Sequence, residues 1–341
     1  MKKFLTVWGL LLFISITSYS QEKKYALYSV AFYNLENLFD TIHDAGKNDF
    51  EYLPNGKWNS MKYEAKLKNM SEILRQLSTD KLPLGPTIIG MSEVENRRVL
   101  EDLLKQPALS DRGYEIVHYE GPDRRGVDCA FFYNPKFFHL TASKLAPYIY
   151  ENNDTTYKTR GFLIASGTLA GEKVHFIVNH WPSRAAASPA RERAGEQVRA
   201  LKDSLLNEDS NAKVIIMGDM NDDPMDKSMA VALGAKRKTQ DTKEHDLYNP
   251  WWDTLKKGNG TLMYDGKWNL FDQIVFTGNL LGNDRSTLKY YRNEIFRRDY
   301  MFQKEGKYKG YPKRTHAGGV WLNGYSDHLP TIIYLIKEIK D

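Results

Sequence analysis

The sequence predicts an α/β fold in which two β-sheets pack face to face and helices cover their outer faces. Short segments rich in β-branched and aromatic residues end at polar residues or glycine, which is typical of strands. Longer segments between them carry apolar residues at helical spacing. Because such strands recur along the whole chain, we expect a two-sheet core flanked by helices. The predicted strands are residues 29–33, 87–91, 114–119, 127–133, 162–169, 174–178, 214–217, 273–276 and 331–335.

Two helices are predicted between these strands. The first covers residues 63–77, where one apolar stripe is formed by Leu67, Met70, Ile73, Leu74 and Leu77. The second begins at Ser188-Pro189, because proline is tolerated in the first turn of a helix, and its apolar residues follow from Leu201 to Leu206.

The chain is expected to form one domain over residues 21–341 and to be a monomer. Its 341 residues can build one large core, and no stretch rich in Pro, Gly or Ser and no internal repeat divides them. The single cysteine, Cys129, lies in an apolar run and cannot form an internal disulfide. Core packing is therefore its expected role.

Residues 1–20 have the pattern of a secretory signal peptide. Lys2 and Lys3 precede an apolar run over residues 4–16, and Ser18 and Ser20 suit a cleavage site. A membrane anchor is the alternative, but the apolar run is shorter than the roughly 20 residues that span a bilayer. The sequence therefore predicts a secreted or periplasmic protein with no stable membrane insertion.

The formal net charge of +5 is unevenly distributed. Residues 285–314, which we call the basic aromatic segment, hold ten Lys or Arg against three acidic residues, so the rest of the chain carries −2. Seven Tyr or Phe residues are interleaved with these charges. Cations beside aromatic rings suit phosphate groups and stacked bases, which predicts nucleic acid or another phosphodiester substrate as the partner. The alternative is a solvated loop whose aromatic side chains pack on the domain.

Polar residues follow the predicted strand 214–217. Side chains alternate along an extended chain, so Asp219 and Asn221 are expected to face the same way. The carboxylate suits metal binding or activation of water, and the carboxamide can donate to a phosphoryl oxygen. An Asx-turn that satisfies only the local backbone is the alternative.

Two further strand ends carry candidate ligands for a hard cation. Glu93 follows the strand 87–91, and Mg²⁺ needs only one or two such carboxylates because it keeps its waters. Glu95 competes with it, since the period of two places both on one face, although Glu95-Asn96 can equally begin the next helix. Asn34 ends the strand 29–33 and is either a ligand or a turn residue.

His180 is the histidine whose setting favours catalysis, because it directly follows the strand 174–178 and can donate a hydrogen bond or a proton. His43, His118, His139, His175 and His245 are expected at the surface or in packing, and His316 is left open. No Cys-His or His-x-x-x-His spacing indicates zinc.

Taken in order, these motifs resemble those of the endonuclease/exonuclease/phosphatase superfamily, which includes deoxyribonuclease I and exonuclease III. The resemblance runs from about residue 29 to residue 335 and implies a four-layered α/β sandwich, with two mostly antiparallel sheets packed face to face and helices outside. It also implies hydrolysis of a phosphoester that depends on Mg²⁺ or Mn²⁺. The motifs are Asn34-Leu35-Glu36-Asn37, Ser92-Glu93-Val94-Glu95-Asn96, Arg125-Gly126-Val127-Asp128, Asn179-His180, Gly218-Asp219-Met220-Asn221, Asp272-Gln273-Ile274 and Ser326-Asp327-His328-Leu329-Pro330.

The resemblance implies a role for each matched residue. Glu93 would be the main metal ligand, with Asn34 and Asp327 beside it. Asp219 and Asn221 would bracket the attacking water and the phosphate.

In the same resemblance, His328 would face the phosphorus centre and be oriented by Asp272. His180 would stabilise the phosphate or assist the leaving group, and Arg160 would contact the phosphate. Whether Asp219 or His328 is the general base stays open, because coupled groups share their protons.

The substrate is less well indicated. Met217 stands where the inositol-polyphosphate 5-phosphatase branch has an aromatic residue, which disfavours that branch, and a DNA-repair role does not suit an exported protein. We expect an endonuclease on DNA or RNA. The alternative is a phosphodiesterase or phosphatase acting on lipid headgroups or small phosphoesters, and a non-catalytic phosphate-binding module is a third hypothesis.

Overall fold

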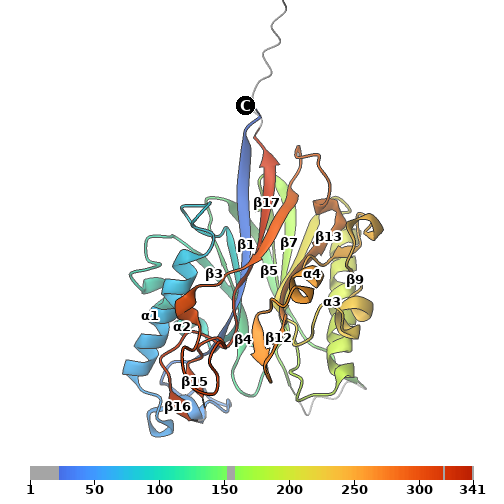
Figure 1. The fold of residues 1–341 in the computed structure, drawn as a ribbon. Helices are drawn as coiled ribbons and strands as arrows, with labels where there is room; N and C mark the ends of the chain where they lie inside the picture. Colours follow the sequence, from blue (N-terminus) through green and yellow to red (C-terminus); the bar gives the residue numbers. More distant parts are fainter. Residues whose placement is uncertain (1–22, 152–157, 318, 340–341) are drawn as a thin grey trace, which may run out of the picture.

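The structure, a computed structural model, describes residues 23–151, 158–317 and 319–339. The predicted signal peptide lies outside these residues. Four layers are visible in Figure 1, where two sheets lie in the middle and helices lie on the outside. The predicted four-layered α/β sandwich is confirmed.

The first sheet has six strands in the order β14-β17-β1-β2-β4-β3. Strands β1 and β2 are parallel, and the other neighbours are antiparallel. The strands are β1 (Tyr25–Leu38), β2 (Ile88–Val94), β3 (Glu115–His118), β4 (Asp128–Tyr133), β14 (Lys289–Ile295) and β17 (Thr331–Glu338).

The second sheet has seven strands in the order β5-β6-β7-β8-β13-β10-β9. Strands β7 and β8 are parallel, as are β9 and β10, and the remaining pairs are antiparallel. The strands are β5 (Phe138–Ala146), β6 (Phe162–Leu169), β7 (Glu172–His180), β8 (Lys213–Asp219), β9 (Ala235–Lys236), β10 (Leu247–Tyr248) and β13 (Asp272–Thr277).

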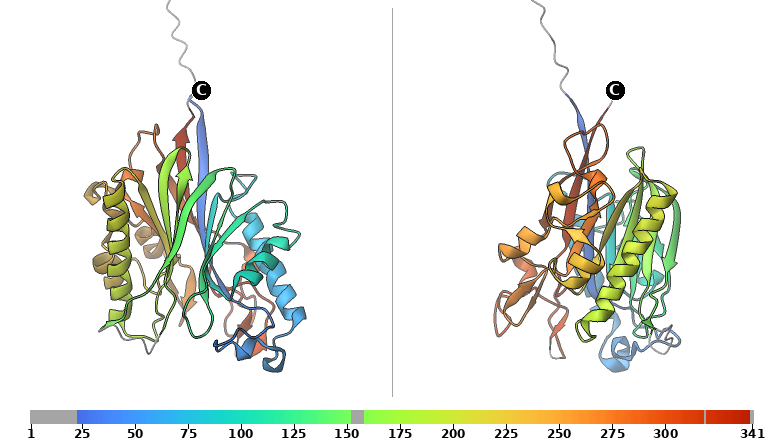
Figure 2. Two further views of the ribbon diagram at one scale, coloured as in Figure 1. Left: turned by 180° about the vertical axis from the view of Figure 1, so that it is seen from behind. Right: turned by 90° about the vertical axis from the view of Figure 1, so that its right-hand side faces the viewer.

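Helices cover the outer face of each sheet (Figure 2). Helices α1 (Ser60–Gln76) and α2 (Arg97–Lys105) bury their apolar stripes against the first sheet. Helix α3 (Ser188–Glu208) packs on the second sheet, with Pro189 in its first turn as predicted. The short helix α4 (Trp252–Lys256) is a minor element. No helix among the described residues has the length and apolar character needed to cross a bilayer.

The core lies between the sheets because alternate residues of each strand point inward. Phe32 and Cys129 of the first sheet meet Phe176, Met217 and others of the second in one buried cluster. The predicted packing role of Cys129 is confirmed, since its side chain belongs to this cluster and is 4% exposed.

The predicted strands are all present, but β5, β9, β10 and β14 of the two sheets were missed. Strand β5 lies at an edge of the second sheet, has only Phe138 buried and contains His139 and Lys144, so its apolar content is low. Strand β14 lies at an edge of the first sheet and inside the basic aromatic segment. Edge strands carry polar side chains on their solvent side, which weakens the sequence signal.

The basic aromatic segment does not form one surface. At its start, the guanidinium of Arg285 lies over the ring of Tyr25, near the end of the sheet where the chain terminates. At its end, Arg314 contacts Asp327 at the opposite edge. The segment therefore crosses the molecule along β14, and only residues after this strand lie near the polar strand ends.

Strand direction brings those ends together. Parallel strands β1 and β2 end at the same edge of the first sheet, and β7 and β8 end at the matching edge of the second. Strands β13 and β17 run antiparallel to β8 and β1, so they begin at that edge. The edge lies at the bottom of Figure 1, opposite the C-terminus. Small two-stranded elements border it: β11 (Leu262–Tyr264) with β12 (Lys267–Asn269), and β15 (His316–Ala317) with β16 (Val320–Trp321).

Gly218→Ala tests how closely β7 and β8 approach before this edge. A Cβ at position 218 would collide with the backbone carbonyl of Asn179 on β7, which cannot move without distorting the sheet. We expect the free energy of unfolding to fall by about 1–3 kcal/mol, measured by urea denaturation. The control is Ser210→Ala in an exposed turn, and equal stability of the two variants would contradict the packing argument.

Candidate active site

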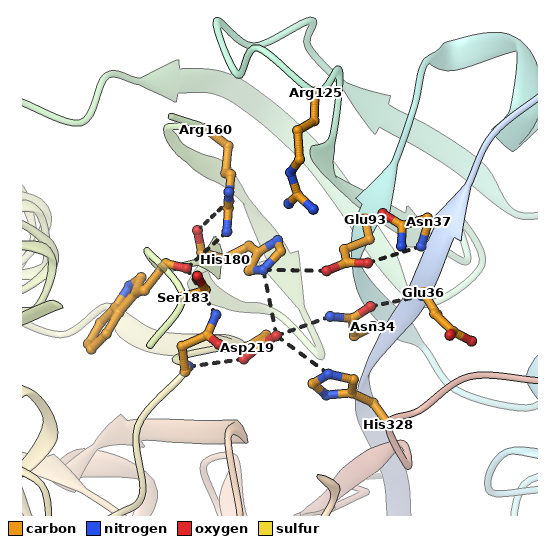
Figure 3. A network of polar contacts seen from close by, with 12 residues as sticks. Asn34, Glu36, Asn37, Glu93, Arg125, Arg160, His180, Ser183, Asp219 and His328 are labelled. Carbon is orange, nitrogen blue, oxygen red and sulfur yellow. Dashed lines mark hydrogen bonds and ion pairs between the residues drawn. The ribbon is translucent and has the colours of Figure 1, made fainter. Parts of the chain in front are cut away.

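Asp219 is the centre of the polar residues at this edge (Figure 3). It is the last residue of β8 and is 2% exposed. Its Oδ2 accepts a hydrogen bond of 3.0 Å from Asn34 Nδ2 and lies 3.6 Å from His180 Nε2 and 3.8 Å from His328 Nε2. Both sheets therefore contribute to the surroundings of one carboxylate.

Asp272 and His328 form a buried pair on one side of Asp219. Asp272 is the first residue of β13 and stands opposite Asp219 in the register of β8 and β13. His328 Nδ1 lies 2.7 Å from Asp272 Oδ2, which leaves Nε2 directed toward Asp219. The structure thus shows the contact through which Asp272 was predicted to orient His328.

Glu93 lies on the other side, with its Oε2 accepting a hydrogen bond of 3.0 Å from the backbone of Asn37. Its Oε1 is 3.8 Å from His180 Nε2, beyond hydrogen-bond distance. Glu93 has a φ of +59° and the register of β2 shifts between Ser92 and Val94. This irregularity explains why Glu93 reaches the site.

Glu95 does not share the face of Glu93, so that expectation was wrong. Its Oε2 accepts a hydrogen bond of 2.7 Å from the backbone of Asp40, away from Asp219. The positive φ of Glu93 breaks the alternation on which the prediction depended. Asn96 caps helix α2 by accepting from Val99 N, as the alternative reading of this motif expected.

Asn34 also departs from its predicted setting, since β1 continues past it to Leu38 through an irregularity. The side-chain Oδ1 accepts from the backbone of Glu36 at 2.8 Å while Nδ2 donates to Asp219. The residue therefore makes the predicted local turn and also contacts the site.

Asn221 does not face the same way as Asp219 by simple alternation, because its φ of +51° ends the extended chain. Its backbone N–H donates to Asp219 Oδ1 at 3.0 Å, which is the Asx-turn foreseen as an alternative. Its Nδ2 donates to Trp181 O at 3.0 Å. The turn orients Asp219, so the local interpretation applies, and the catalytic role of the two residues stays a prediction.

Arg160 lies behind His180 and is 6% exposed. Its guanidinium donates to His180 O at 2.9 Å, Trp181 O at 3.0 Å and Asp123 Oδ2 at 3.0 Å. These bonds secure the end of β7. Contact between Arg160 and a phosphate stays a prediction.

Arg125 was not singled out from the sequence, although it belongs to a quoted motif. Figure 3 shows its side chain directed toward the space between His180 and Glu93. The guanidinium is half exposed, and its nearest charged group is Asp123, at 3.9 Å. The sequence signal for it was its place before β4, which begins near the site.

Asp327 is joined to β1 through a bridging arginine. Arg314 donates to Asp327 Oδ2 at 2.8 Å and to Glu36 Oε1 at 2.9 Å. Lys66 of α1 is buried and donates to Thr315 Oγ1 at 2.6 Å. Burial raises the pKa of Glu36 to about 7 and lowers the pKa of Lys66 to about 8. Sequence reasoning missed this network because its members are distant along the chain.

Burial and charge set the protonation of the central residues. Burial lowers the pKa of His328, but the charges of Asp272 and Asp219 outweigh it and raise this pKa well above its ordinary value. Burial lowers the pKa of His180 well below its usual range, and Arg160 and Arg125 add to that effect. Burial raises the pKa of Asp219 to about 7, which the charge of His328 opposes. His180 is therefore neutral and His328 is the cation.

The donor set suits a hard divalent cation. Oxygen ligands are available from Glu93 Oε1, which makes no hydrogen bond, and from the second lone pair of Asn34 Oδ1. Asp327 Oδ1 lies 3.9 Å from His328 Nε2, at the border of the site. Asp219, Asp272 and His328 offer another group of potential ligands, but the Asp272–His328 bond occupies two of their atoms.

Comparison with known proteins agrees with this geometry. A model of the Endonuclease/Exonuclease/phosphatase family matches residues 29–337. The chain belongs to this family. Its members are metal-dependent phosphoester hydrolases that include nucleases and phosphatases, and this family member is an enzyme of that class. No curated protein sequence matches the chain.

Solved structures share the fold of this family member at low sequence identity. ANGEL2, a 2′,3′-cyclic phosphatase, has a TM-score of 0.58 at 11% identity, with 94% of this chain and 100% of that chain covered. A mannosyl-6-phosphatase from Bacteroides thetaiotaomicron has a TM-score of 0.54 at 16% identity, with 90% and 99% covered. TDP2 of D. rerio, complexed with a single-strand DNA product, has a TM-score of 0.52 at 15% identity, with 91% and 99% covered.

Asp219→Asn tests the central carboxylate of this family member. Asparagine keeps an acceptor for Asn221 N but loses the charge, so we expect kcat/KM for a chromogenic phosphodiester to fall about 10²–10⁴-fold. The thermal transition measured by circular dichroism should show a folded protein. Asp209→Asn, at the end of α3 and away from the site, is the matched control. Equal activity of the two variants would contradict the role of Asp219.

Glu93→Gln tests the cation site. We expect a chelator to abolish turnover of the wild type, and the variant to need at least about tenfold more Mg²⁺ for half-maximal rate, because a neutral ligand binds the cation more weakly.

Glu95→Gln is the matched control for this test, since it lies two residues away and contacts only the Asp40 backbone. Its Mg²⁺ dependence should equal that of the wild type. The same increase in both variants would contradict ligation by Glu93.

Proposed function

We propose that this protein is an exported phosphodiesterase, dependent on Mg²⁺ or Mn²⁺, that cleaves DNA or RNA as an endonuclease. The observation that carries this substrate choice is a cavity of about 770 Å³ that opens beside the site. Arg314 and Asp327 belong to both the cavity wall and the site network, so a substrate whose phosphate lies at Asp219 extends into this cavity. Export is supported by the pattern of residues 1–20.

The cavity combines aromatic rings with cations. Tyr264 is 74% exposed and Tyr308 is 48% exposed, and both line it. Lys307 and Arg314 contribute positive charge to the same wall, and Asp265, Glu305 and Asp327 also line it. Aromatic faces stack on bases while cations contact the backbone phosphates, which is the pattern of single-strand binding grooves. The neighbour TDP2, solved in complex with a single-strand DNA product, supports this choice by analogy.

Asp219 is proposed as the general base and His328 as the charged donor. A carboxyl group whose pKa is about 7 accepts a proton from water near neutral pH. His328 is held as the imidazolium by Asp272, so it cannot accept a proton and instead stabilises negative charge on the phosphoryl oxygens. Neutral His180 donates a hydrogen bond on the opposite side, and Arg125 faces the same space.

The cation would be held by Glu93, Asn34 and Asp327. When bound, it neutralises charge on the phosphate and orients the attacking water. Asn34 couples this group to the base, because its amide contacts Asp219 through Nδ2. Binding of the cation and orientation of Asp219 thus depend on the same side chain.

A small or lipid phosphoester is the second candidate. The same cavity contains Leu262, Met263, Val320 and Leu322, which suit an apolar group attached to the phosphate. The experiment incubates the purified protein with plasmid DNA, single-stranded RNA, sphingomyelin vesicles and a chromogenic phosphodiester, each with and without a chelator. Chelator-sensitive cleavage of DNA or RNA supports the proposal. Turnover of sphingomyelin without cleavage of DNA or RNA would favour the lipid phosphoester instead. No turnover of any substrate would indicate a binding module.

Tyr308→Ala tests the cavity as the nucleic-acid subsite. Loss of one stacking ring should raise KM for single-stranded DNA about tenfold, with little change for the chromogenic phosphodiester, because only the longer substrate reaches the cavity. Tyr291→Ala is the matched control. Tyr291 is 51% exposed in the same basic aromatic segment but lies on β14, outside the cavity. An equal effect of both variants would contradict the cavity as the nucleic-acid subsite.

A further inference from the structure

A second group of potential metal ligands lies on the first sheet, apart from the candidate active site. His118 ends β3 and Asp128 begins the neighbouring strand β4, while Glu120 follows β3 at the surface. One ligand atom from each of the three residues lies within 4.8 Å of the others. The sequence had indicated only surface or packing roles for His118.

Two polar atoms in this group are buried without a hydrogen-bond partner. They are His118 Nε2 and Asp128 Oδ2, whose side chains are each 2% exposed. An unpartnered buried polar atom is destabilising because it has lost its hydrogen bonds to water, so two of them facing each other require an explanation.

The distance between these atoms indicates what is missing. His118 Nε2 and Asp128 Oδ2 are 3.6 Å apart, which is longer than a hydrogen bond between nitrogen and oxygen. Two ligands of a tetrahedral cation, each about 2.1 Å from it, are separated by about 3.4 Å. The observed separation is therefore close to that of two atoms sharing one cation.

The third residue can complete the set. Glu120 offers a carboxylate oxygen within 4.8 Å of a ligand atom of each of the other two residues, and its side chain is 55% exposed and free to adjust. Its Oε1 lies 3.8 Å from His118 Nδ1, so this side chain has to turn toward Nε2 to share a cation with Asp128.

We propose that His118, Glu120 and Asp128 bind a divalent transition-metal cation of the Zn²⁺ or Co²⁺ type. The nitrogen ligand favours these ions over Mg²⁺ and Ca²⁺, which prefer oxygen alone. Three protein ligands leave the fourth position of a tetrahedral site to water. This site is independent of the nuclease proposal.

The cation would brace the loop that faces the active site. The ligands lie on both sides of residues 121–127, a loop that carries Asp123, the partner of Arg160, and Arg125. Lys47 already fastens this loop by donating to Gly121 O at 2.7 Å and Asp123 O at 3.0 Å. A metal at the loop base would add a second attachment, so its role is positioning.

The test measures metal stoichiometry in a Glu93→Gln background, which weakens the active-site cation. After metal stripping, we expect calorimetric titration with Zn²⁺ and native mass spectrometry to show one tightly bound ion. Adding Asp128→Asn should weaken Zn²⁺ binding at least about 100-fold, because even residues outside the ligand set typically contribute 10–100-fold. Asparagine retains the acceptor for Gly121 N, so the loop keeps that bond.

Glu120→Gln gives a second measurement at an exposed residue, should Asp128→Asn fail to fold. His139→Asn, on the exposed side of β5, is the matched histidine control and should leave Zn²⁺ binding unchanged. A Co²⁺ absorption spectrum that loses intensity with Asp128→Asn but not with His139→Asn supports the site. Unchanged Zn²⁺ affinity in both Asp128→Asn and Glu120→Gln would overturn it, whatever the protein hydrolyses.

Discussion

The burial of Asp219 between two sheets is the constraint on which the rest of the site depends. A carboxylate removed from water needs compensating groups, and Asn34, His328 and the backbone of Asn221 provide them. Asn34 lies on β1 of the first sheet, whereas His328 and Asn221 lie in the loops next to β17 and β8. The sheets must therefore pack closely for these groups to compensate the buried charge of Asp219.

The same burial separates the two histidines by charge. His328 has Asp272 at its far nitrogen and becomes a cation, whereas His180 has arginines behind it and stays neutral. Their sequence settings are similar, since both lie at strand ends. Their neighbours in space alone assign them different chemistry.

The border of the site is held by ion pairs between segments far apart in the chain. Arg314 connects Glu36 of β1 to Asp327, and its neighbour Thr315 is bound by Lys66 of α1. This arrangement attaches the wall of the cavity to the catalytic edge. The proposed substrate contact and the proposed phosphate chemistry are thereby held at a fixed separation.

The sequence by itself determined the sandwich, the predicted strands and the residues at their ends, because strand periodicity and polar termini are local properties. It did not predict β5 or β14, whose solvent-facing sides carry polar residues. It also misplaced Glu95, since it had no means of detecting the positive φ of Glu93.

Only the tertiary structure decided the charge state and the contacts of each predicted residue. The charges of His328 and His180, the double role of Asn34 and the bridge through Arg314 depend on distances between strands that are far apart in sequence. The same holds for His118, which has an ordinary setting along the chain and an unpartnered buried nitrogen in the fold. The residue types indicate which chemistry is available. Burial and neighbouring charge determine the protonation state of each residue, and therefore which part of that chemistry it can carry out.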